Sequence, residues 1–217
     1  MISSTKNVCV ECGTETPHLY TLYQHSQALA MTTCQYCNSV CDPYLEHDVV
    51  LKAIDLILHK PAIYRHLLFN WTREKYLCDG DIRMMSGGGY MKRRWWLLVP
   101  MLEVLGHADS ITFGLIVRFS LLWVLRFLCL RWLICRHETE LLPFMLLLTS
   151  FPLLFNVLML IWRHEYQADG FAYEWLVRMA VLTSQAEGLN VISTIGYLKA
   201  YFYVLGTAAL LMVIFRQ

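Results

Sequence analysis

Apolar side chains are distributed unevenly along this chain. Residues 1–94 mix polar and apolar positions, whereas residues 95–217 hold most of the leucine, phenylalanine, tryptophan and valine. Three apolar stretches, 111–135, 141–162 and 195–215, are long enough as helices to cross a hydrocarbon core of about 30 Å. The pattern therefore predicts a small water-facing domain followed by a multi-span α-helical membrane domain.

The apolar stretches differ in how cleanly they predict a span. Residues 141–162 carry no charge, and Pro152 is expected to kink their helix. Residues 111–135 contain three arginines, which leaves open whether this stretch spans the bilayer or lies in its interface. Residues 95–106 are predicted to form an interfacial helix, and residues 171–184 an interfacial or half-buried helix. Three or four spans, and hence either side for the C-terminus, stay open.

A basic cluster, Lys92 to Arg94, stands directly before the apolar half. By the positive-inside rule this cluster keeps the N-terminal half in the cytosol. Residues 1–20 lack the apolar core of a secretory signal, which agrees with that side. We therefore expect a multi-pass protein whose N-terminus is cytosolic.

Charge changes sign along the N-terminal half. The 217 residues carry a net charge of only +1, with a mean hydropathy of +0.42, so no nucleic-acid partner is expected. Residues 1–48 have one lysine against five carboxylates, whereas residues 52–94 have nine basic side chains against four acidic ones. Basic side chains beside a membrane favour anionic headgroups. The candidates for a lipid-headgroup or partner surface are Arg65, His66, Arg73 and Lys75. Alternatively, Arg65 and His66 pack between the N-terminal domain and a helix.

Two Cys-x-x-Cys pairs open the chain, at Cys9, Cys12, Cys34 and Cys37. In a cytosolic segment this spacing is typical of a Zn²⁺ site, because each pair supplies two thiolates from one tight turn. Gly13 suits the backbone reversal after the first pair. The residues between the pairs favour one or two short strands. The sequence therefore predicts a zinc ribbon whose folding energy comes largely from the metal.

The cysteines and histidines of the N-terminal half have alternative interpretations. The two pairs could instead be redox-active thiols, although nothing around them resembles thioredoxin. Cys41 could replace a ligand, but we favour a bystander because four cysteines already complete the shell. His18, His25 and His47 are expected to be surface residues rather than ligands.

Two short helices are predicted after the cysteines. Asp48 is a plausible N-cap for the first helix. The apolar stripe predicted on that helix consists of Val49, Ala53, Leu56 and Ile57. Pro61 is expected to end or kink that helix, and a second short helix begins after it.

The paired cysteines, "CDPYLEHD" at 41–48 and "AIDLILHKPAIYRHLLFN" at 53–70 together resemble the signature of the Arv family. The resemblance covers about Val8 to Asn70, and "VLTSQAEGLNVI" at 181–192 is similar to a second, weaker family stretch. Where this chain has "DPYLEHD" the family often has "DKYIEYD". A role of that family lysine therefore does not carry over to Pro43.

The resemblance implies a membrane protein of the endoplasmic reticulum, with the Golgi as a second location. It implies a mediator of sterol homeostasis and of sterol and sphingolipid transport and distribution, which also supports glycosylphosphatidylinositol anchor synthesis. The implied partners are these lipids, glycosylphosphatidylinositol intermediates and a membrane glycosyltransferase complex. The alternative function is a non-catalytic zinc-ribbon adaptor subunit of such a complex. A RING-type ubiquitin ligase is disfavoured because it needs eight ligands for two zinc ions.

No catalytic motif stands out, so the chain is not expected to be an enzyme. The expected organisation has four parts: a cytosolic zinc ribbon (1–47), a helical extension (48–70), a linker with the basic cluster and an interfacial helix (71–106), and a transmembrane region (107–217).

Overall fold

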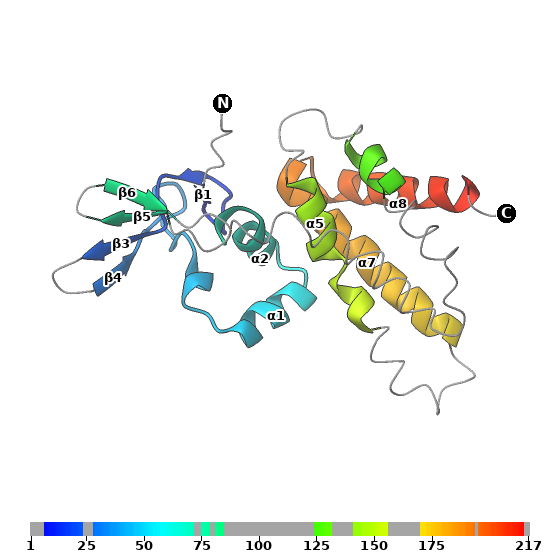
Figure 1. Cartoon of the computed structure of the whole chain (residues 1–217), viewed down its shortest axis with the longest axis horizontal. Coiled ribbons are helices and arrows are strands. Elements are labelled where there is room, and N and C mark those ends of the chain that lie inside the picture. Colours follow the sequence, from blue (N-terminus) through cyan, green and yellow to red (C-terminus); the bar gives the residue numbers. More distant parts are fainter. Residues whose placement is uncertain are drawn as a thin grey trace. The chain divides into compact units, whose positions relative to one another are not determined.

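Two compact units, Met1–Lys92 and Arg93–Gln217, divide the chain in this computed structural model. The first unit consists of short strands and short helices, and the second is helical (Figure 1). The structure describes residues 7–23, 28–71, 75–78, 81–84, 124–131, 141–155, 170–193 and 195–214.

The first unit contains two small sheets. β1 (Asn7–Val8) pairs antiparallel with β2 (Glu15–Thr16) around the first cysteine pair. The second sheet has the order β4-β3-β5-β6. β3 (Tyr20–Tyr23) and β4 (Ala28–Met31) pair antiparallel between the two cysteine pairs, where the sequence predicts one or two short strands.

The remaining strands lie where the sequence predicts a linker. β5 (Lys75–Cys78) runs parallel to β3, and β6 (Asp81–Met84) pairs antiparallel with β5. Both strands fall within the stretch 71–106. The sheet is therefore completed by residues more than 50 positions beyond β3, and the β-rich N-terminal fold with its cysteines and short helices is confirmed.

The short helices begin where the sequence predicts. A 3-10 turn, η1 (Pro43–Leu45), follows the second cysteine pair, and α1 (Val49–Ile57) comes next. The Asp48 carboxylate caps α1 by accepting from the N–H of Leu51 at 2.8 Å. Pro61 then opens the next helix, where its missing N–H costs nothing.

The second short helix changes pitch along its length. α2 (Pro61–Arg65) continues directly into a π-helical turn, η2 (His66–Asn70). The N–H of Trp71 closes this turn on the carbonyl of His66 at 2.8 Å. The wider turn buries both His66 and Asn70. Such π turns often occur at functional sites, and this one contacts β1 beside the cysteines.

The second unit is built around one long helix. α7 (Gly170–Ser193) contacts α5 (Leu142–Thr149), the 3-10 turn η5 (Phe151–Leu153) and α8 (Tyr197–Ile214). Residues 124–131 are also helical. The glycine at 188 lets α7 approach α5 closely, because a Cβ there would lie 2.7 Å from the Thr149 side chain.

Two helices differ from the sequence prediction. The short interfacial or half-buried helix predicted over 171–184 is part of a longer helix, α7, which has 24 residues. The single kinked helix predicted over 141–162 is interrupted, since α5 ends at Thr149 and η5 takes over around Pro152. Proline has no N–H for the helix and its ring clashes with a preceding carbonyl, which accounts for the break.

Among the helices in the described ranges, none combines the length and the apolar character that crossing a membrane requires. The multi-span membrane domain is therefore not confirmed and stays a prediction. The helices predicted over 95–106 and over much of 111–135 lie outside the described residues.

Candidate metal centre

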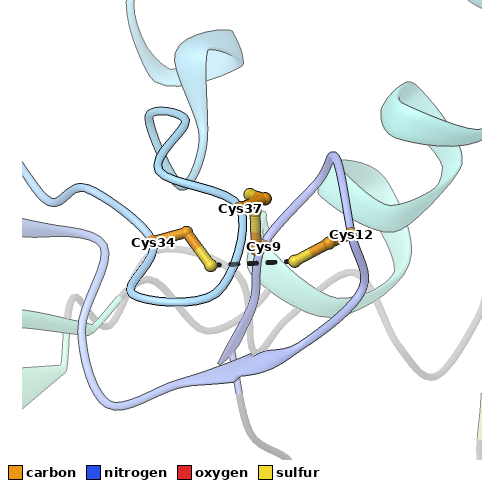
Figure 2. A group of neighbouring side chains, drawn as sticks. All are labelled: Cys9, Cys12, Cys34 and Cys37. Atoms are coloured by element: carbon orange, nitrogen blue, oxygen red, sulfur yellow. Dashed lines mark hydrogen bonds between the residues drawn. The ribbon is translucent and has the colours of Figure 1, made fainter.

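The four paired cysteines converge on one point. Cys9 and Cys12 come from the loop between β1 and β2, and Cys34 and Cys37 come from the loop after β4, as Figure 2 shows. All four Sγ atoms lie within 4.8 Å of one another. The structure therefore assembles the cluster of thiols that the sequence spacing predicts.

The sulfur distances fit a tetrahedral metal ion. Cys9 Sγ lies 3.7 Å from Cys37 Sγ, and Cys12 Sγ lies 3.7 Å from Cys34 Sγ. Zn–S bonds of about 2.3 Å in a tetrahedron place sulfur atoms about 3.8 Å apart. A disulfide would bring the sulfurs to about 2.0 Å, and all four thiols are free. The four residues could thus hold one metal ion between two separate loops.

The two cysteine loops have the same backbone design. In each loop the N–H of the residue after the second cysteine donates to the carbonyl of the first, from Gly13 to Cys9 and from Asn38 to Cys34, both at 2.9 Å. Both donors adopt left-handed backbone conformations, with φ of 78° and 58°. Glycine and asparagine accept this conformation more readily than other residues do. The sequence indicated the reversal at Gly13, but the equivalent role of Asn38 was missed.

The protein environment shifts the pKa values of Cys9, Cys12 and Cys34 by different amounts and in different directions. Burial raises the pKa of Cys9 to about 12. Burial also opposes ionisation of Cys12, yet its hydrogen bonds to Thr14 and the neighbouring thiols outweigh it and lower the pKa to about 6. The backbone N–H of Cys37 is the main cause of a lowered pKa at Cys34. One thiol in each loop therefore has a lowered pKa, and a metal ion bound by these cysteines would displace thiol protons.

Cys41 is buried but stands outside the cluster of four. Burial, and then the charges of the neighbouring thiols, raise its pKa to about 11. Its backbone nevertheless joins the two loops, because its carbonyl accepts from the N–H of Val10 at 2.9 Å and its N–H donates to Thr32 at 2.8 Å. His18 and His47 are outside the cluster as well, and His25 lies outside the described residues.

Arg65 stabilises the first cysteine loop through hydrogen bonds to its backbone. Its guanidinium Nη1 donates to the carbonyl oxygens of Val10 at 2.6 Å and Glu11 at 2.8 Å. These carbonyls belong to the two peptide groups whose N–H groups face the Cys9 sulfur. The cation therefore fixes both peptides and strengthens their N–H dipoles towards that sulfur.

A buried polar network lies next to the same loop. The carboxylate of Asp42 accepts from Asn70 Nδ2 at 2.7 Å and from the N–H of Tyr44 at 3.1 Å, and lies 2.8 Å from His66 Nδ1. Asn70 also holds both backbone groups of Val8, accepting from its N–H at 3.0 Å and donating to its carbonyl at 2.9 Å. Asp42, His66 and Asn70 are each buried. This network attaches η2 to the strand that leads into Cys9.

Of the residues predicted to form a headgroup surface, Arg65 and His66 are the two whose side chains the structure describes. Arg65 and His66 pack against the cysteine loops, as the alternative interpretation of the sequence held. Lys75 contributes its backbone to β5, and Arg73 lies outside the described residues. Sequence reasoning missed Asp42 and Asn70 as supports of the centre. The signal was present, since both residues stand within the quoted motifs "CDPYLEHD" and "YRHLLFN".

Comparison with known proteins identifies the same family as the sequence motifs do. The sequence model of the Arv1-like family matches residues 8–132. "Protein arv1" of Schizosaccharomyces pombe is 49% identical over 63 residues, which cover 29% of this chain and 24% of that protein. "Protein ARV1" of Homo sapiens is 29% identical over 232 aligned positions, covering 96% of this chain and 81% of that protein. "Protein ARV1" of Saccharomyces cerevisiae is 43% identical over 63 residues, 29% of this chain and 19% of that protein. No solved structure matches the chain significantly.

Proposed function

This chain belongs to the Arv1-like family, and from that premise we propose that it mediates sterol homeostasis and the distribution of sterols and sphingolipids at the endoplasmic reticulum. The proposal includes support for glycosylphosphatidylinositol anchor synthesis, and it assigns no catalytic step to the chain. The observation that carries it is the extent of the family match, which begins at the first cysteine loop and continues to residue 132, well into the apolar half.

The cysteine centre takes a structural part in this proposal. Cys9, Cys12, Cys34 and Cys37 would hold one Zn²⁺, and four thiolates leave no open position for a substrate or a water molecule. The ion would supply folding energy to a unit whose buried core is small and consists in part of these same cysteines. The centre then fixes the shape of the surface that the first unit presents.

The membrane arrangement is also part of the proposal. The apolar stretches within 107–217 would anchor the chain, and the basic residues at 92–94 would keep the first unit in the cytosol. That side of the membrane is reducing, which suits four free thiols.

Purification of the full chain from membranes in mild detergent tests the function. Lipids and proteins that remain bound are identified together by mass spectrometry, and a detergent extract of the same membranes serves as the reference. We expect sterols or sphingolipids to be enriched several-fold over that reference. A stoichiometric glycosyltransferase subunit without lipid enrichment would instead support the adaptor function. If neither lipid enrichment nor a stoichiometric partner is found, both functions are contradicted.

A further inference from the structure

α1 directs its apolar side chains away from the unit that carries it. None of its nine residues is buried. Six aliphatic side chains on the helix and at its C-terminal cap are between 45% and 80% exposed: Val49, Val50, Leu51, Ile54, Ile57 and Leu58. We call these six the α1 ridge. Scattered exposed aliphatic residues are ordinary, but a contiguous group of this kind indicates an interaction surface.

The polar side of α1 is the side held by the rest of the unit. Asp55 Oδ2 accepts from the hydroxyl of Tyr44 at 2.8 Å, and Asp55 Oδ1 lies 2.6 Å from Lys60 Nζ. Tyr44 itself is buried beside His66. The ion pair with Lys60 is the main reason why the pKa of Asp55 is lowered. An amphipathic helix on a globular domain normally turns its apolar side inward, so α1 has the opposite orientation.

The chemistry of the α1 ridge selects its partner. The six side chains are aliphatic, without the tryptophan, tyrosine and arginine that dominate protein–protein interfaces. Six side chains are also far fewer than the roughly 20–30 residues that each partner contributes to a standard protein interface. A bilayer needs neither a matched groove nor a large area, because a convex aliphatic helix face simply enters the interface by about 5–10 Å.

The charges around α1 are compatible with that partner. The carboxylate of Asp55 is paired with Lys60 and tucked against Tyr44. The ridge itself contains no charged side chain, so its insertion avoids placing a charge in hydrocarbon, which is the main cost of entering a membrane. At 100° per residue, Lys52 lies almost opposite the middle of the ridge.

We propose that the α1 ridge inserts into the interfacial layer of a lipid bilayer, so that the first unit lies on the membrane surface. The inference rests on the proposed function in one respect, namely that the apolar half anchors the chain in a membrane. Because an anchor makes docking intramolecular, a ridge of modest intrinsic affinity suffices. The metal centre, joined to α1 through η1 and the Tyr44–Asp55 contact, would then be held at a fixed distance from the lipid.

Site-specific photo-crosslinking tests the ridge in the full chain. Benzoylphenylalanine replaces Val50, Ile54 or Ile57 on the ridge, or Lys52 on the other side of the same helix as the matched control. Each variant is reconstituted in phosphatidylcholine–phosphatidylserine vesicles, irradiated and analysed by mass spectrometry. We expect phospholipid adducts at least several-fold more abundant at the three ridge positions than at position 52. Bound zinc measured in each variant shows that the unit is folded, and any one folded ridge variant decides the question.

Two other outcomes separate the ridge from the membrane anchor. In the first outcome, the chain resists alkaline carbonate extraction, so the anchor stands. The ridge inference is then overturned if the ridge crosslinks to a second copy or to another part of this chain, or if it crosslinks to lipid no more than position 52 does. If carbonate releases the chain from the vesicles, both the anchor and the ridge inference fail. A Val50→Gln/Ile57→Gln variant should lower the lipid adducts at position 54 several-fold, whereas Lys52→Gln should not.

Discussion

The guanidinium of Arg65 donates to the carbonyl oxygen of Val10 at 2.6 Å, although 55 positions separate the two residues. The same nitrogen reaches Glu11 at 2.8 Å. A side chain from the end of α2 thus holds the backbone between Cys9 and Cys12. The contact links a basic residue of the "YRHLLFN" motif to the first cysteine loop.

Replacing Arg65 should therefore weaken metal binding. We expect Arg65→Gln to lower zinc affinity by about 10-fold or more, because residues that support metal ligands typically contribute that much. Arg65→Lys should retain part of the affinity, since an ammonium group keeps the charge but loses the planar fork. Competition with a chromophoric chelator measures the affinity in the full chain. Lys52→Gln removes the same charge from α1 and should leave affinity unchanged; a loss equal to that of Arg65→Gln would contradict a specific role.

The cysteines offer a second test, through a matched pair of substitutions. Cys34→Ser should abolish stoichiometric zinc, because a hydroxyl replaces one of four thiolates. Cys41→Ser should keep one zinc per chain, although Cys41 is equally buried and only seven positions away. Elemental analysis of the purified chain gives both stoichiometries. Loss of zinc from Cys41→Ser with retention in Cys34→Ser would show that the ligand set is different.

Asn70 provides a test of the buried network. Asn70→Ala removes a side chain that makes three hydrogen bonds, two to Val8 and one to Asp42. We expect a loss of about 3 kcal/mol in the free energy of unfolding, because buried polar partners remain unsatisfied. Asn70→Asp should be worse, since it places a second carboxylate beside Asp42.

Amide hydrogen exchange at Val8 checks this directly, because its N–H donates to Asn70 Oδ1. Protection should fall in both Asn70 variants and persist in Gln35→Ala, which removes an exposed amide from the same unit. Unchanged exchange at Val8 in Asn70→Ala would contradict the clamp.

Features of the first unit that depend on neighbouring residues are predictable from the sequence, whereas contacts between distant residues are not. The cysteine loops and the Asp48 cap are set by residues a few positions apart, so their spacing alone predicts them. The pairing of β5 with β3 and the clamp of Asn70 on Val8 join residues more than 50 positions apart. Nothing local in the sequence specifies such partners. The orientation of α1 is a similar case, because a hydrophobic stripe does not tell whether it faces a core or something outside.

The full length of α7 is not predicted from the sequence for a different reason. Its second half, which includes "QAEGLN" at 185–190, is polar enough to favour a loop, yet these side chains are mostly buried against α5 and its neighbours. Packing in the second unit thus outweighs local preference. Gly188 is central to that packing, because it removes a side chain at the closest approach to Met145 and Thr149.

The helix contact in the second unit is testable with two glycines. Gly188→Ala places a Cβ 2.7 Å from Thr149 and 2.9 Å from Met145, and should destabilise the unit by about 1–3 kcal/mol through overpacking. Gly206→Ala in α8 meets nothing within 4 Å and should stabilise its helix by about 0.5–1 kcal/mol. Thermal unfolding in detergent compares the two variants. Equal behaviour would contradict the close approach of α7 and α5.

X-ray absorption at the zinc edge of the full, reduced chain tests the metal centre most directly. We expect one zinc per chain, surrounded by four sulfur atoms at about 2.3 Å with no oxygen or nitrogen neighbour. A chain without zinc whose Cys9, Cys12, Cys34 and Cys37 are joined as disulfides, or a zinc ion with nitrogen or oxygen ligands, would contradict it.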